Sequence, residues 1–215
     1  MASSILVRYK VKKTRRTLSA LFSFIAKLPK TRYGVNRFDL DDDGVWELRH
    51  PALPNIDPDD FVFAAEYLES DDFGHRSPRD GDGDQMDEAF AQCIAAWGVA
   101  EKLGMHDFMD HIIDKLERHI EPELLAIFIF ATQVYGAGDN TGLLSQERLK
   151  DYLATYIAEN WWIFLADDHL SGGFIEGIQK LPELERDIYA RRMAALNERL
   201  DTEEDGSGDG DMDAR

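Results

Sequence analysis

Residues 87–119 read DEAFAQCIAAWGVAEKLGMHDFMDHIIDKLERH and contain two helix-length runs separated by one glycine, Gly104. Both runs space their apolar side chains three and four residues apart, which places those side chains on one helix face: Phe90, Cys93, Ile94, Trp97 and Ala100, then Phe108, Met109, Ile112, Ile113 and Leu116. Gly104 stands where a helix end favours a residue that tolerates positive φ. Neither helix can bury its apolar face alone, so the two are predicted to form a hairpin around a common core.

Further elements are predicted on both sides of this hairpin. Asp57-Pro58 precedes an amphipathic run at 61–68, which is typical of an N-cap followed by proline in the first helical turn. Residues 124–135 are apolar nearly all round and predict a helix central to a core. Helical spacing continues in three later segments: 145–157 with Ser145 as a possible cap, 174–178, and 182–200. Residues 4–12 alternate between apolar and polar and predict a strand.

Several of these segments resemble a BTB/POZ domain. Residues 92–116, which include Ala-Glu-Lys-Leu-Gly-Met at 100–105, are similar to the fourth and fifth helices of that family. The Asp-Pro-x-x-Phe pattern at 57–61, with Tyr67-Leu68 behind it, resembles the third helix and precedes them in the right order. Val11-Lys12-Lys13 stands where the family carries a motif with histidine, which this chain lacks. The resemblance implies an α/β, mostly α, fold: a small sheet flanked by helices, followed by a C-terminal helical extension.

This interpretation divides the chain into parts. Residues 1–120 are expected to form the BTB/POZ-like domain, and residues 121–200 resemble the BACK-like helical region that follows many such domains. Residues 70–87 are rich in Asp, Gly, Ser and Pro and predict a flexible insertion. Residues 201–215 are acidic and Gly-rich and predict a disordered tail.

The charge of the chain is strongly negative and unevenly distributed. The formal net charge is −18, yet residues 1–37 contain ten Lys or Arg and no acid. A chain this acidic would repel phosphate at long range, so general nucleic-acid binding is not expected. No stretch reaches about eighteen consecutive apolar residues, so no membrane span is expected.

Cys93 is the only cysteine, which fits a reducing compartment and an intracellular, cytoplasmic or nuclear, location. Its place on an apolar helix face predicts a buried structural thiol. The first 28 residues are Arg/Lys-rich, contain Ser and Thr and lack acids, so they share traits with transit peptides. Organelle import is therefore the alternative location.

No motif assembles catalytic chemistry. Asp39, Asp41, Asp43 and Gly44 match the first half of a calcium loop, but His50 stands where that loop needs Glu, so an acidic turn is expected. The kinase-like tripeptide Asp-Phe-Gly at 72–74 lacks the other kinase motifs. Three histidines lie near acids on the second hairpin helix, where solvated polar groups are favoured over a metal site: His106, His111 and His119. No catalytic, cofactor-binding or metal residue is therefore predicted.

The leading hypothesis is a non-enzymatic protein–protein interaction module. The resemblance implies either self-association into an oligomeric scaffold or an adaptor role on a cullin-type ubiquitin ligase. It also implies that Tyr67, Leu68 and Phe73 contact partners, since the end of the third helix faces partners in that family; the alternative is that they are core or loop residues. Two other hypotheses stay open: a metal-dependent protein or enzyme with a site of dispersed Asp, Glu and His, and an organellar helical structural protein.

Overall fold

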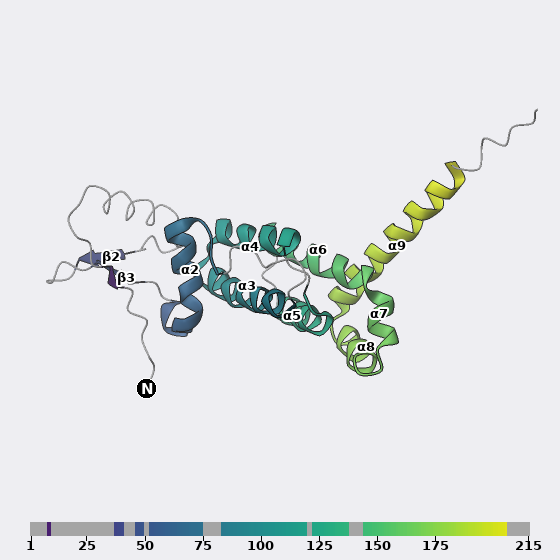
Figure 1. Cartoon of the computed structure of the whole chain (residues 1–215), viewed down its shortest axis with the longest axis horizontal. Coiled ribbons are helices and arrows are strands. Elements are labelled where there is room, and N and C mark those ends of the chain that lie inside the picture. The colour runs from purple at the N-terminus through teal and green to yellow at the C-terminus, as the bar shows by residue number, and fades with distance from the viewer. Residues whose placement is uncertain are drawn as a thin grey trace, which may run out of the picture. The chain divides into compact units, whose positions relative to one another are not determined.

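The computed structural model describes residues 8–9, 37–40, 46–49, 52–74, 83–119, 122–137 and 144–205. The chain divides into two compact units, residues 1–122 (unit 1) and residues 123–215 (unit 2). Figure 1 shows the elements of each unit in chain order.

The described residues of unit 1 contain a short 3₁₀ helix, η1 (Leu53–Asn55), and three α-helices: α2 (Pro58–Ser70), α3 (Gly83–Leu103) and α4 (His106–His119). Helix α2 begins as predicted, because the Asp57 side chain accepts the Asp59 N–H at 2.9 Å and Pro58 occupies the first turn. The hydrogen bond satisfies one of the backbone donors that a first helical turn leaves unpaired, and Pro58 has no N–H to satisfy.

The hairpin of α3 and α4 is confirmed. Gly104 joins the two helices with φ at 67°, and the Met105 N–H donates back to the Ala100 carbonyl at 2.9 Å. Helix α3 begins at Gly83, earlier than the predicted start at Asp87. The apolar faces of both helices are buried together: Phe90, Cys93, Trp97, Ala100, Phe108, Met109, Ile112, Ile113 and Leu116.

Unit 2 contains five described helices: α5 (Leu124–Gly136), α6 (Leu144–Glu159), α7 (Trp161–Ala166), α8 (Ser171–Gln179) and α9 (Pro182–Asp205). Helix α6 packs against α5 and α9, while α8 packs against α7 and α9. The core is formed by fully or nearly fully buried side chains: Ile127, Leu149, Leu153, Ile157, Phe164, Phe174, Leu184 and Ile188. Ser145 lies inside α6 and not at its start, so its predicted capping role is wrong.

The predicted α/β fold, a BTB/POZ-like small sheet flanked by helices, is wrong, because the described core is all-helical. The described residues also include three short strands, which pair antiparallel in the order β1-β3-β2: β1 (Arg8–Tyr9), β2 (Arg37–Leu40) and β3 (Trp46–Arg49). They span two to four residues each, and every core residue described belongs to a helix or to a turn beside one. Helices here bury their apolar faces against other helices, which needs no sheet.

Some predicted features lie partly or wholly outside the described residues. The predicted insertion, 70–87, is described in part. Ser70 ends α2, residues 71–74 form a turn, and α3 begins at Gly83. Residues 75–82 lie outside the described residues. Helix α9 continues to Asp205, into the segment predicted as a tail, and 206–215 are outside. The transit-like segment, apart from β1, and most of the calcium-loop-like stretch also lie outside.

Candidate functional site

The three predicted interface residues lie inside unit 1. Tyr67, Leu68 and Phe73 are only 9%, 3% and 2% exposed. The Tyr67 ring stacks on Phe108 with centroids 4.3 Å apart, and the Phe73 ring meets Phe108 edge-on at 5.1 Å. Their burial favours the core interpretation that the sequence had left open.

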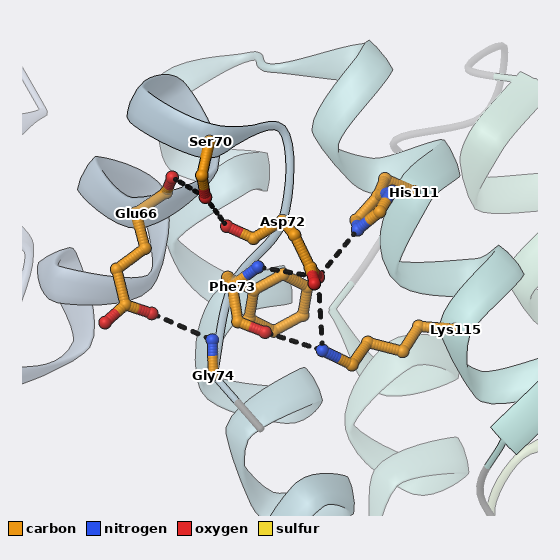
Figure 2. A network of polar contacts seen from close by, with 7 residues as sticks. All are labelled: Glu66, Ser70, Asp72, Phe73, Gly74, His111 and Lys115. Carbon is orange, nitrogen blue, oxygen red and sulfur yellow. Dashed lines mark hydrogen bonds and ion pairs between the residues drawn. The ribbon is translucent and has the colours of Figure 1, made fainter. Parts of the chain in front are cut away.

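A polar network surrounds Asp72 in the turn after α2 (Figure 2). Its Oδ1 accepts the Phe73 N–H at 2.8 Å and lies 3.4 Å from both His111 Nε2 and Lys115 Nζ on α4. Lys115 also donates to the Phe73 carbonyl at 2.5 Å, and its Nζ lies 4.4 Å from the centre of the Phe73 ring. The Lys115 side chain is 6% exposed, so its charge is compensated inside the protein by a carboxylate, a carbonyl and a ring face.

The electrostatics of this network favour the ionised carboxylate. Burial alone would raise the pKa of Asp72, but the Phe73 N–H, the Lys115 ammonium and His111 outweigh it and hold the pKa below the ordinary 3.8. Beside it, Glu66 Oε2 accepts the Gly74 N–H at 2.8 Å, and Ser70 Oγ lies 2.9 Å from the carbonyl oxygens of both Glu66 and Asp72, which share its one hydrogen. The network therefore fastens the turn after α2 to α4, which is a structural role.

Cys93 is confirmed as a buried thiol. Its side chain is fully buried, and burial raises the pKa of the thiol to about 12, although the nearby Lys115 charge acts in the opposite direction. A thiol with such a pKa carries almost no thiolate at neutral pH, so it does not act as a nucleophile.

The histidines of α4 do not gather metal ligands in the described part of the chain. His111 faces Asp72, and its ring packs at 5.3 Å from Tyr67 and 6.0 Å from Phe73. Among the described residues, no group of three or more His, Cys, Asp or Glu side chains is arranged to hold a metal ion. Nor does any described helix combine the length and apolar character that crossing a membrane requires.

Unit 2 carries an open groove at the place where α6 and α7 meet the second half of α9, which we call the Trp162 groove. Its volume is about 550 Å³, and it is lined by Thr155, Ala158, Glu159, Trp162, Arg191, Arg192, Ala194, Ala195, Leu196, Glu198 and Arg199. Consecutive helical residues point about 100° apart, so the two tryptophans of α7 separate. Trp161 is 6% exposed and packs inside, whereas Trp162 is 70% exposed at the groove.

Three arginines and two glutamates line the Trp162 groove. The Arg192 guanidinium carbon lies 4.4 Å from the Trp161 ring centre and 5.3 Å from the Trp162 ring centre, within the range of cation–π contacts. Arg191 forms an ion pair with Asp151. The groove lining thus combines an exposed indole, arginine side chains beside it and three alanines.

The sequence interpretation missed this groove. It did not single out Trp161 or Trp162, although two adjacent large aromatic residues on a helix surface cannot share one face. That angular argument was the available signal, and it predicts that one of the two indoles lies away from the core.

No protein-family model, no curated protein and no solved structure matches this chain. The BTB/POZ resemblance therefore stays a prediction.

Proposed function

We propose that this chain is a non-enzymatic protein-interaction module and that the Trp162 groove is where its unit 2 binds a protein partner. The observation that carries this proposal is the 70% exposure of the Trp162 side chain at the edge of a formed groove. Trp and Arg are the residue types most enriched among the side chains that dominate protein–protein binding energy. Here both types line one concave surface.

The apolar surface extends beyond the single tryptophan. Tyr189, Met193 and Leu196 lie four and three residues apart on α9 and are each about half exposed, at 47%, 56% and 49%. An isolated exposed apolar side chain is ordinary on a protein surface, but a group of them beside a groove marks an interaction site. The arrangement supports recognition of another protein.

The groove lining supports binding and not catalysis. Its ionisable groups are three arginines, which do not lose a proton in proteins, and two glutamates. Proton transfer needs a group with a pKa near the working pH and positioned against the substrate. The arginines are suited instead to recognition of charged and aromatic groups.

The proposal does not extend to a cullin-type adaptor role. That role rested on the BTB/POZ-like sheet and helices, and the all-helical core replaces that fold. The interaction hypothesis itself needs only a surface, which unit 2 presents.

The test is quantitative affinity capture from cell lysate with the full chain and two variants. Trp162→Ala removes the indole, and Ile163→Ala is the matched control because Ile163 is the adjacent exposed residue, at 54%, and does not line the groove. Loss of a dominant side chain costs about 2 kcal/mol or more, which is roughly thirtyfold in affinity. We expect a protein that the original chain and Ile163→Ala both recover and Trp162→Ala does not. Equal recovery of all proteins by the three chains would reject the proposal.

A further inference from the structure

We draw no further inference here: the strongest candidate, the Trp162 groove between α6, α7 and α9, belongs to the site already described, and nothing in the structure shows what covers it, because Arg191 is paired with Asp151 and two glutamates line the groove beside the arginines.

Discussion

Replacement of Asp72 by Asn tests the role of the polar network in unit 1. The change keeps the shape of the side chain but leaves Lys115, whose side chain is 6% exposed, without its carboxylate partner. Breaking a fully buried ion pair costs about 3–5 kcal/mol. Because the Asp72 side chain is 35% exposed and Lys115 keeps its bond to the Phe73 carbonyl, we expect a smaller loss, about 1–2 kcal/mol of unfolding free energy.

The pH dependence of this effect follows from the lowered pKa of Asp72. A carboxyl group whose pKa is lower in the folded than in the unfolded state stabilises the fold above its unfolded-state pKa, which is 3.8. That contribution is present at neutral pH and is lost as the pH falls through 3.8 toward the lower folded-state value. The difference in stability between the original chain and Asp72→Asn should therefore shrink below about pH 4.

The assay is urea denaturation followed by far-UV circular dichroism between about pH 3 and pH 7. Asp71→Asn is the matched control, because it removes the same charge one residue earlier, and Asn tolerates the left-handed backbone found there, with φ at 62°. We expect it to change stability by less than about 0.5 kcal/mol. An Asp72→Asn chain as stable as the Asp71→Asn chain at pH 7, or a difference that grows on acidification, would refute the reasoning.

Three further predictions concern buried groups. Cys93, fully buried and with a pKa of about 12, should react with a thiol reagent at pH 8 only on the timescale of unfolding, and rapid labelling of the folded chain would contradict this. Gly177→Ala should lower the free energy of unfolding by about 1–3 kcal/mol in thermal or urea denaturation, because the new Cβ would lie 2.7 Å from Cζ of Phe128. Gly173→Ala is the control, because a Cβ at that position of the same helix meets no atom within 4 Å and should not destabilise the chain. Equal stabilities of the two variants would contradict the prediction. Tyr135→Phe should lower the free energy of unfolding in urea by about 1–2 kcal/mol, because the buried hydroxyl lies 3.2 Å from a carbonyl of α6 and 3.1 Å from a carboxylate of α9. A variant within about 0.3 kcal/mol of the original chain, which is about the error of the fit, would contradict this prediction.

Local patterns in the sequence were sufficient to predict the helices. The three-and-four spacing around Gly104 specified the α3–α4 hairpin, and Asp57-Pro58 specified the start of α2. Both signals act within one or two helical turns, so they can be identified without knowledge of the rest of the fold. The sheet-based fold was wrong because it was transferred from a resemblance carried by helices, and an amphipathic hairpin is common to many helical folds.

The polar network around Asp72 and the Trp162 groove both depend on contacts between residues that are distant in the sequence. Lys115 meets the Asp72 turn across 43 residues of sequence, and no local pattern marks that pair. The buried Phe73 was predicted to lie in a flexible insertion, because its neighbours are polar and only packing against Phe108 reveals its place. The Trp162 groove exists because α9 runs on past α6, which depends on helix lengths and packing and not on local spacing.

The most direct test of the Trp162 groove as a partner site is photo-crosslinking in cells. A p-benzoylphenylalanine residue replaces Leu196, which is 49% exposed at the groove, and in a second chain it replaces Ile163, which is exposed outside it. If the groove binds a protein partner, we expect a discrete crosslinked protein from position 196 that is lost when Trp162→Ala is added, and none of that protein from position 163. No crosslink from position 196, or the same product from both positions, would contradict the account.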